Sequence, residues 1–416
     1  MFAITLHSGS WSPPTRPCIG LKTESYIEPR VAAVRHRGVP PVVALGGGIT
    51  LAAVLNILHR NGLPYYALCP PRDFVRRSRW FRPLPTRLAD PRPTDIVGLL
   101  EALELESAFL LPCSDDWLRA VAQLPAHLAA RFPSNTPWSC AELLTDKWRF
   151  AEVLQNLGIP HPRTHLITSR EELSAVPDSC LEGAILKPLS SVAFASRHGV
   201  KGYVVQNRHE AEALLSQVEL PIMLQEFIPG PPAAGYFLDG YRDRTGRIAA
   251  LFARRRVRMH PARLGNSTLV ESVPLHCLPS AIFSLDYLFD RISYRGIFSA
   301  EFKYDARDRE FKLIEINARP WWYVEFAELC GVDVCQLAYQ DAMGQPVPQI
   351  HNYAVGRRGG LFLHDLRAWK TGGNQHVSLF SILKTWTAAD STPFHKSDPL
   401  PGLFYLLRIC CPLFGT

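Results

Sequence analysis

Apolar and polar positions alternate with a period of two in residues 297–303 and again in residues 311–317. The alternation sets Phe298, Ala300 and Phe302 against Ser299, Glu301 and Lys303, and it puts Leu313, Glu315 and Asn317 on one face of the second segment. This period predicts two strands joined as an antiparallel hairpin. If the turn is symmetric, with residue 305 opposite residue 311, Glu301 lies opposite Glu315.

The expected pairing places two carboxylates and the amide of Asn317 on one face of the hairpin. Two carboxylates roughly 5 Å apart repel each other, so the pair is stable chiefly when a cation lies between them. Oxygen ligands of this kind suit Mg²⁺, which completes its octahedron with water and phosphate oxygens. The alternative is a solvated hairpin whose charged residues face water. Ile314, Ile316 and the following Pro-Trp-Trp favour a mostly buried strand instead.

Residues 41–113 show a pattern typical of a parallel sheet with helices. The apolar run 41–45 ends at three consecutive glycines, residues 51–60 have helical spacing, and apolar runs 65–68 and 108–113 follow. The glycines would let a ligand approach the backbone, but Leu51 stands where a dinucleotide-binding turn has its third glycine, so a tight structural turn is favoured. The following Ser114-Asp115-Asp116 either lines a substrate pocket or only caps the next helix.

A second region begins near Ser139, which is expected to cap a helix. Lys147 follows in the first turn of another helix, and Lys187 falls inside the apolar strand 183–188. An unpaired ammonium in such a strand costs several kcal/mol, so we expect an anion beside Lys187, and a phosphate is the natural one. Strand 222–228 ends in a Pro-Gly turn that suits the presentation of backbone groups to the edge of a purine.

Residues 248–260 read as a strand in which Arg254, Arg256 and Arg258 share a face. One interpretation is a solvated edge strand protected by charge. The other is a positive wall for an acyl phosphate or a substrate carboxylate, because the arginine fork matches planar anions. Within this wall Arg258 is the favoured catalytic residue, and Glu271 of the following strand is expected to pair with it or to orient an amine.

Composition narrows the classes of partner. The 416 residues, 47% of them apolar and 20% charged, are typical of a globular protein of two or three domains. A net charge of +7 without a zinc-finger, RNP or basic-zipper pattern favours small anions over nucleic acids. Ten scattered cysteines without a Cys-x-x-Cys spacing predict reduced thiols and a cytoplasmic location.

The two ends of the chain carry weaker signals. Residues 1–40 show no periodicity and are expected to form an irregular extension without a targeting signal. The apolar tail 400–414 is too short and too interrupted, by Arg408 and by prolines, to cross a membrane. We expect it to pack as a last helix, and contact with a membrane surface is the alternative.

Five motifs in a fixed order resemble the ATP-grasp superfamily of carboxylate-amine ligases. They are Asp146-Lys-Trp-Arg-Phe150, Leu186-Lys-Pro188, Gln225-Glu-Phe-Ile-Pro-Gly230, Ser299-Ala-Glu-Phe302 and Glu315-Ile-Asn-Ala-Arg-Pro320. The resemblance covers about residues 41–345, and the wording of the last two motifs looks most like D-aspartate ligase and the carbamoyl-phosphate-synthetase-like group. It implies an α/β (α+β) chain with a Rossmann-like parallel-sheet domain (41–140), an ATP-grasp domain (141–345, lid about 160–224) and a C-terminal extension (346–416).

The resemblance also implies roles for single residues. The phosphates of ATP would be held by Lys147 and Lys187, with Lys201 as the cation of a glycine-poor lid, and the adenine by the linker Gln225, Glu226, Phe227 and Ile228. Glu301, Glu315 and Asn317 would bind Mg²⁺ or Mn²⁺. Arg319, on the same face as Asn317, would stabilise the transferring phosphoryl group.

The implied reaction is phosphorylation of a carboxylate to an acyl phosphate, followed by attack of an amine and release of phosphate. The expected partners are therefore a small carboxylate and an amine, and an oligomer is compatible with this reading. A nucleotide-binding protein that has lost catalysis is one alternative. A dehydrogenase that uses the triple-glycine turn is another.

Overall fold

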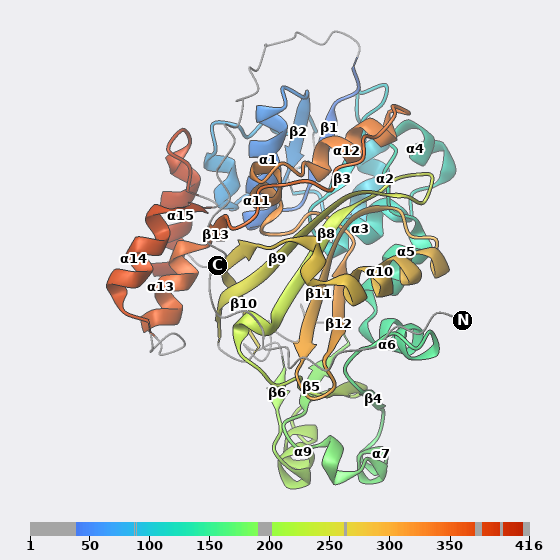
Figure 1. Cartoon of the computed structure of the whole chain (residues 1–416). Helices are drawn as coiled ribbons and strands as arrows, with labels where there is room; N and C mark the ends of the chain where they lie inside the picture. The colour runs from blue at the N-terminus through green and yellow to red at the C-terminus, as the bar shows by residue number, and fades with distance from the viewer. Residues whose placement is uncertain are drawn as a thin grey trace, which may run out of the picture. The chain divides into compact units, whose positions relative to one another are not determined.

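The structure is a computed structural model that describes residues 39–86, 88, 90–189, 202–261, 264–370, 377–391 and 394–410. Its first sheet is parallel, in the order β2-β1-β3, and consists of β1 Val42–Leu45, β2 Tyr65–Leu68 and β3 Phe109–Pro112. The helices around it are α1 Gly48–Arg60, α2 Ile96–Glu101, α3 Asp115–Ala122, α4 Ala126–Arg131 and α5 Trp138–Thr145. The predicted parallel unit is therefore confirmed (Figure 1).

The triple-glycine turn between β1 and α1 binds the carboxylate of Asp73. The Asp73 carboxylate accepts a hydrogen bond from the Gly48 amide at 2.8 Å, at the beginning of α1. A methyl group on Gly47 would come within 2.4 Å of the same carboxylate. A negative charge thus occupies the position where a bound pyrophosphate would lie, which favours the structural interpretation of the turn.

The central sheet has the order β12-β11-β8-β9-β10-β13-β14. Its strands are β8 Gly235–Arg242, β9 Ile248–His260, β10 Asn266–Ser272, β11 Gly296–Asp305, β12 Glu310–Asn317, β13 Arg358–Gly360 and β14 Ala389–Ser391. One face packs on α10 Pro279–Arg291. The other shares a core with α1, α11 Val324–Leu329 and α12 Val334–Ala342, which joins the first sheet to the central one.

The hairpin β11–β12 pairs Glu301 with Glu315, as the sequence predicts, but the route to that pairing differs. The turn pairs residue 305 with residue 310, not 311, and a register shift between Glu301 and Phe302 compensates for the difference. Because Phe302 faces Leu313, that leucine lies in the core under α10. The prediction that Leu313 shares a face with Glu315 is therefore wrong, since a one-residue shift exchanges the two faces of a strand.

A smaller antiparallel sheet has the order β4-β7-β5-β6. It consists of β4 Thr164–Ile167, β5 Ile185–Pro188, β6 Tyr203–Val204 and β7 Ile222–Gln225, with α7 Arg170–Ala175 and α9 Arg208–Leu215 against it. Helix α6 Lys147–Asn156 precedes it, capped by the Asp146 carboxylate. Ser139 does not cap a helix, because it lies inside α5, which begins at Trp138. The glycine-poor stretch of the lid, residues 190–200, and Lys201 lie outside the described residues.

The C-terminal extension adds to the central sheet and ends in helices. Strand β13 pairs with β10, and β14 pairs with β13. The helices are α13 Phe362–Lys370, α14 Leu379–Thr387 and α15 Pro399–Cys410. Tyr405 of α15 packs on Phe74 with ring centres 4.9 Å apart, so the tail docks as a last helix, as expected. Among the described helices, none has the length and apolar character needed to cross a bilayer.

Candidate nucleotide and acyl-transfer site

A cleft of about 720 Å³, open to solvent, lies between α6, the small sheet and the edge strand β12. Its polar lining consists of Asp115, Thr145, Lys147, His161, Thr164, Lys187, Gln225, Glu315 and Asn317. Its apolar wall includes Phe150, Leu154, Met223 and Ile316. The cleft therefore brings together five of the predicted site residues, from four elements that are far apart in the sequence.

The amide of Gln225 holds Lys187 at the end of the small sheet. The Lys187 ammonium donates to Gln225 Oε1 at 2.7 Å, and Gln225 Nε2 donates to Thr164 Oγ1 at 3.1 Å. Gln225 is 7% exposed, while the Lys187 side chain is half-buried and reaches the cleft. The Gln225 amide thus fixes the position of the Lys187 ammonium beside the cleft.

Arg319 is clamped by a carboxylate from the beginning of α3. Its Nε and Nη2 atoms donate to the two oxygens of Asp115 at 2.7 and 3.1 Å, and Nη2 also donates to Asn317 Oδ1 at 3.2 Å. Burial opposes the charge of Arg319, but Asp115 outweighs it, so the pKa of the guanidinium is raised. A fixed cation is therefore placed beside Asn317 at the rim of the cleft. Ser114 does cap α3, and Asp115 lines the cleft, while the binding of a substrate there stays a prediction.

Glu301 has a basic partner in this structure. Arg256 Nη2 donates to Glu301 Oε1 at 2.8 Å, which offsets part of the repulsion between Glu301 and Glu315. No three acidic, histidine or cysteine side chains gather into a metal site within the described residues. The predicted set contains two carboxylates and one amide, a donor set that fits Mg²⁺ when phosphate and water oxygens complete it. Its role in metal binding stays a prediction.

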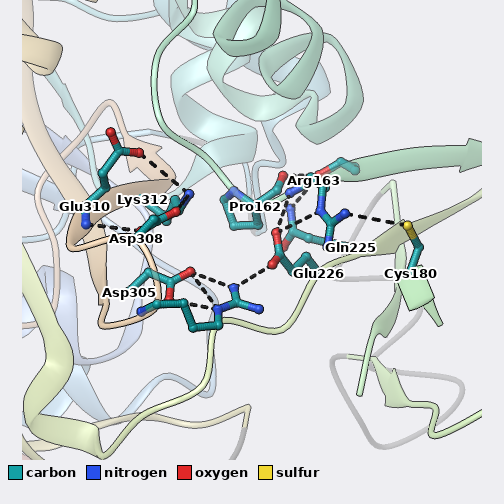
Figure 2. A network of polar contacts seen from close by, with 11 residues as sticks. Pro162, Arg163, Cys180, Gln225, Glu226, Asp305, Asp308, Glu310 and Lys312 are labelled. Atoms are coloured by element: carbon teal, nitrogen blue, oxygen red, sulfur yellow. Dashed lines mark hydrogen bonds and ion pairs between the residues drawn. The ribbon is translucent and has the colours of Figure 1, made fainter. Parts of the chain in front are cut away.

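The side chain of Glu226 lies in an ion-pair network outside the cleft. It accepts from the Arg163 amide at 3.1 Å and from Arg307 Nη2 at 2.5 Å, and Arg307 also bonds to Asp305 (Figure 2). Burial opposes the charged form of Glu226, but these bonds outweigh it and lower the pKa of the carboxyl group. The network ties the small sheet to the turn of the β11–β12 hairpin. Contact of Glu226 with adenine through main-chain atoms stays a prediction.

We expect Glu226→Gln to lower the free energy of unfolding by about 1 kcal/mol at pH 7. Because the pKa of Glu226 is lowered by folding, its contribution is present above the ordinary carboxyl pKa and is lost as the pH falls through the folded value. Urea unfolding at pH 7 and at about pH 3 would measure this. The variant and the wild type should converge in acid, while the exposed Glu182→Gln should differ little at either pH. A deficit that persists in acid would contradict the assignment.

The two linker residues after Glu226 are Phe227 and Ile228. Ile228 is buried, with 4% of its surface exposed, and the Lys303 ammonium lies 5.4 Å from the centre of the Phe227 ring. Burial, reinforced by Arg256, lowers the pKa of Lys303. Their contact with adenine is not tested by these positions and stays a prediction.

The arginine strand β9 is an interior strand of the central sheet, so the interpretation as a solvated edge is wrong. Three of its four arginines are buried, and each of the three has an acidic partner: Arg254 with Asp239, Arg256 with Glu301 and Arg258 with Asp365. Thr268 and Trp386 also donate to the Asp365 carboxylate, so Arg258 anchors α13 to the sheet. Glu271 pairs with Arg255 and Arg358, so the expected pairing with Arg258 is wrong, and its role in orienting an amine stays a prediction.

Two of these interactions lie outside the predicted motifs. Arg163, just before β4, and Arg307, in the turn between β11 and β12, both bind Glu226. The pairing of Asp115 with Arg319 crosses 204 positions of the chain. Such distant groups come together only through the order of the strands in the fold. The acidic pair Asp115-Asp116 directly after the apolar run 108–113 was the one local signal that this position carries a functional group.

No family model matches the chain. Two curated relatives do. The chain is 25% identical over 258 residues to a D-aspartate ligase of Enterococcus faecium, a match of 56% of this chain and 58% of that ligase. It is 23% identical over 211 residues to the C-terminal section of the carbamoyl phosphate synthase large chain of Methanopyrus kandleri, a match of 50% of this chain and 39% of that protein. The chain thus spans about half the length of these relatives.

Solved structures with the same arrangement cover more of the chain. N5-carboxyaminoimidazole ribonucleotide synthetase of Thermus thermophilus superposes with a TM-score of 0.58 at 18% identity, over 76% of this chain and 81% of that one. The biotin carboxylase domain of the Hydrogenobacter thermophilus 2-oxoglutarate carboxylase, solved with MgADP and bicarbonate, superposes with a TM-score of 0.57 at 15% identity, over 77% and 74%. These likenesses confirm the resemblance that the motifs indicated, and the chain has the ATP-grasp fold.

Proposed function

We propose that this chain is an ATP-dependent ligase that joins a small carboxylate to an amine. The observation that carries the proposal is the cleft, which gathers Lys147, Lys187, Glu315 and Asn317 around a space next to an apolar wall. Two ammonium groups, one carboxylate and one amide suit a nucleotide triphosphate with its metal ion. The curated relatives, one named D-aspartate ligase and one a carbamoyl phosphate synthase chain, support the same chemistry.

In this mechanism the protein positions groups and neutralises charge. Lys147 and Lys187 hold the phosphates, and the linker from Gln225 to Ile228 lies beside the adenine. Glu301, Glu315 and Asn317 would hold Mg²⁺, which supplies positive charge to the phosphate oxygens. The substrate carboxylate attacks the γ-phosphorus and ADP leaves; the amine then attacks the acyl carbon and phosphate leaves with the C–O bonding pair.

Arg319 is the proposed catalytic cation of this site, because Asp115 and Asn317 fix its guanidinium beside the predicted metal ligands. Such a preorganised charge stabilises the transferring phosphoryl group without reorganisation during the step. Arg258 lies in a buried pair with Asp365, so we give it the role of holding the C-terminal extension in place. The cytoplasm is the proposed location, since the described cysteines are all free thiols.

The test is release of ADP and phosphate from MgATP in the presence of pools of amino acids and other small carboxylates. Release that requires one acid and one amine, with a product whose mass equals their sum less water, is the expected result. MgATP binding without release from any pool would instead identify a nucleotide-binding protein without catalysis. Tight NADH binding without MgATP binding would favour the dehydrogenase.

A further inference from the structure

Helix α15 turns a stripe of large apolar side chains to solvent. The stripe consists of Leu400, Leu403, Phe404 and Leu407, which are 50%, 47%, 38% and 45% exposed. This spacing of three and four residues follows one face of a helix. Pro401 and Gly402 of the same helix are buried. The helix thus docks on the body by one face and leaves an apolar face partly exposed to solvent.

A strongly basic segment borders this α15 stripe. Residues 72–82 carry the exposed arginines Arg72, Arg76, Arg77, Arg79 and Arg82. The guanidinium of Arg77 lies 4.6 Å from the centre of the Phe404 ring, and Arg79 donates to the Ser397 carbonyl just before α15. Asp73, the acidic residue of the segment, is occupied by the Gly48 and Val75 amides. The segment therefore presents positive charge beside the stripe.

Helices α13 and α14 add to the exposed apolar surface of the extension. Leu379, Phe380 and Leu383 of α14 are 39%, 77% and 47% exposed. Helix α13 lies beside α14 and α15 (Figure 1). Phe362 of α13 stacks on Trp386 of α14, and His364 of α13 forms a hydrogen bond with Tyr405 of α15. The extension is thus one packed group of helices with large uncovered side chains. A surface of this kind marks an interaction site.

The charge beside the stripe decides between the candidate occupants. A second copy docked through the same face would bring two arginine segments together, and their repulsion opposes such a pair. A bilayer with anionic headgroups accepts apolar side chains at its interface and attracts arginines at the same time. We propose that the α15 stripe and the arginine segment form a docking site for an anionic membrane surface.

The test uses the full chain and sedimentation with vesicles of phosphatidylcholine, with or without about 30% phosphatidylserine. Binding to the anionic vesicles should exceed binding to the neutral ones at least about tenfold and should weaken in high salt. Leu403→Ser/Phe404→Ser should lower it at least about tenfold. Phe283→Ser, which removes a 74% exposed aromatic ring from α10, is the matched control and should bind as the wild type does.

A second variant tests the contribution of the arginine segment to membrane binding. Arg76→Gln/Arg77→Gln should lower binding to the anionic vesicles about fivefold for each charge, with little change on neutral ones. Arg291→Gln, at an exposed arginine of α10, is its control. Absence of binding to anionic vesicles, or binding unchanged in both variants, would overturn the proposal. So would a wild type that ignores vesicles but self-associates in sedimentation equilibrium, with a monomeric Leu403→Ser/Phe404→Ser variant, because a second copy would then cover the stripe.

Discussion

Glu315→Gln should lower the rate of ADP release in the presence of the carboxylate substrate about a thousandfold, while the protein still folds. Glu315 is exposed in the cleft, opposite Glu301, whose charge is already partly offset by Arg256. Removing the Glu315 charge therefore removes most of the free negative charge that would hold Mg²⁺ there. Loss of a metal that stabilises the transferring charge costs several kcal/mol, and about 1.4 kcal/mol corresponds to a factor of ten. Initial rates over a range of Mg²⁺ concentrations would measure the loss.

The matched control for this prediction lies on the same strand. Glu310→Gln also removes one carboxylate charge from β12, but at the opposite end of the strand, where Glu310 is exposed and pairs with Lys312. This variant should keep the wild-type rate and the wild-type dependence on Mg²⁺. Equal activity of Glu315→Gln and Glu310→Gln would remove Glu315 from the proposed metal site. A thermal melt of each variant separates a lost ligand from a lost fold.

The elements that the sequence predicts well are those whose signal is local. The parallel unit around β1 and α1 and the hairpin β11–β12 follow from apolar spacing within about fifteen residues, because burial on one face imposes a period on the chain. Even the pairing of Glu301 with Glu315 was found. The register shift itself was not predicted. A symmetric turn without a shift, and the observed turn with a shift between Glu301 and Phe302, both pair Glu301 with Glu315. Leu313 was therefore assigned to the wrong face.

The arginine strand shows why the rest could not be predicted. Alternation placed Arg254, Arg256 and Arg258 on one face, but whether that face meets water depends on the strands beside β9. Its neighbours β8 and β10 bury it, and buried arginines need acidic partners. Those partners come from other parts of the chain, and Asp365 lies 107 positions from Arg258 in a region without any motif. The assignment of Arg258 to the substrate followed from charge alone, without its partner.

The C-terminal extension contacts strand β9 through one of these ion pairs, next to the arginine that binds Glu301. Asp365 holds Arg258 two positions from Arg256, which in turn donates to Glu301. His395, just before α15, also bonds to the buried Glu325 next to Arg60 of α1. Packing of the extension thus supports the strand that carries the partner of a predicted metal ligand.

Arg319→Lys is expected to lower kcat about a thousandfold while the affinity for MgATP changes little. The guanidinium makes two bonds to Asp115 and a third to Asn317, a geometry that a single ammonium does not reproduce. Because this charge acts on the transferring phosphoryl group and not on the adenine, its loss should lower kcat and leave the affinity for MgATP nearly unchanged. Steady-state rates together with a separate measurement of nucleotide binding would distinguish the two quantities.

Asp115→Asn tests whether the clamp itself matters, since it leaves Arg319 in place and weakens its hold. A loss of about tenfold in kcat is expected, smaller than for Arg319→Lys, because the introduced amide still accepts one hydrogen bond but fixes the guanidinium less firmly than the two bonds of the carboxylate. Arg291→Lys on the surface of α10 is the control and should leave kcat unchanged. If Arg319→Lys instead weakened nucleotide binding and kept kcat, Arg319 would be a binding residue. The stabilisation of the phosphoryl group would then have to come from Lys147 and Lys187.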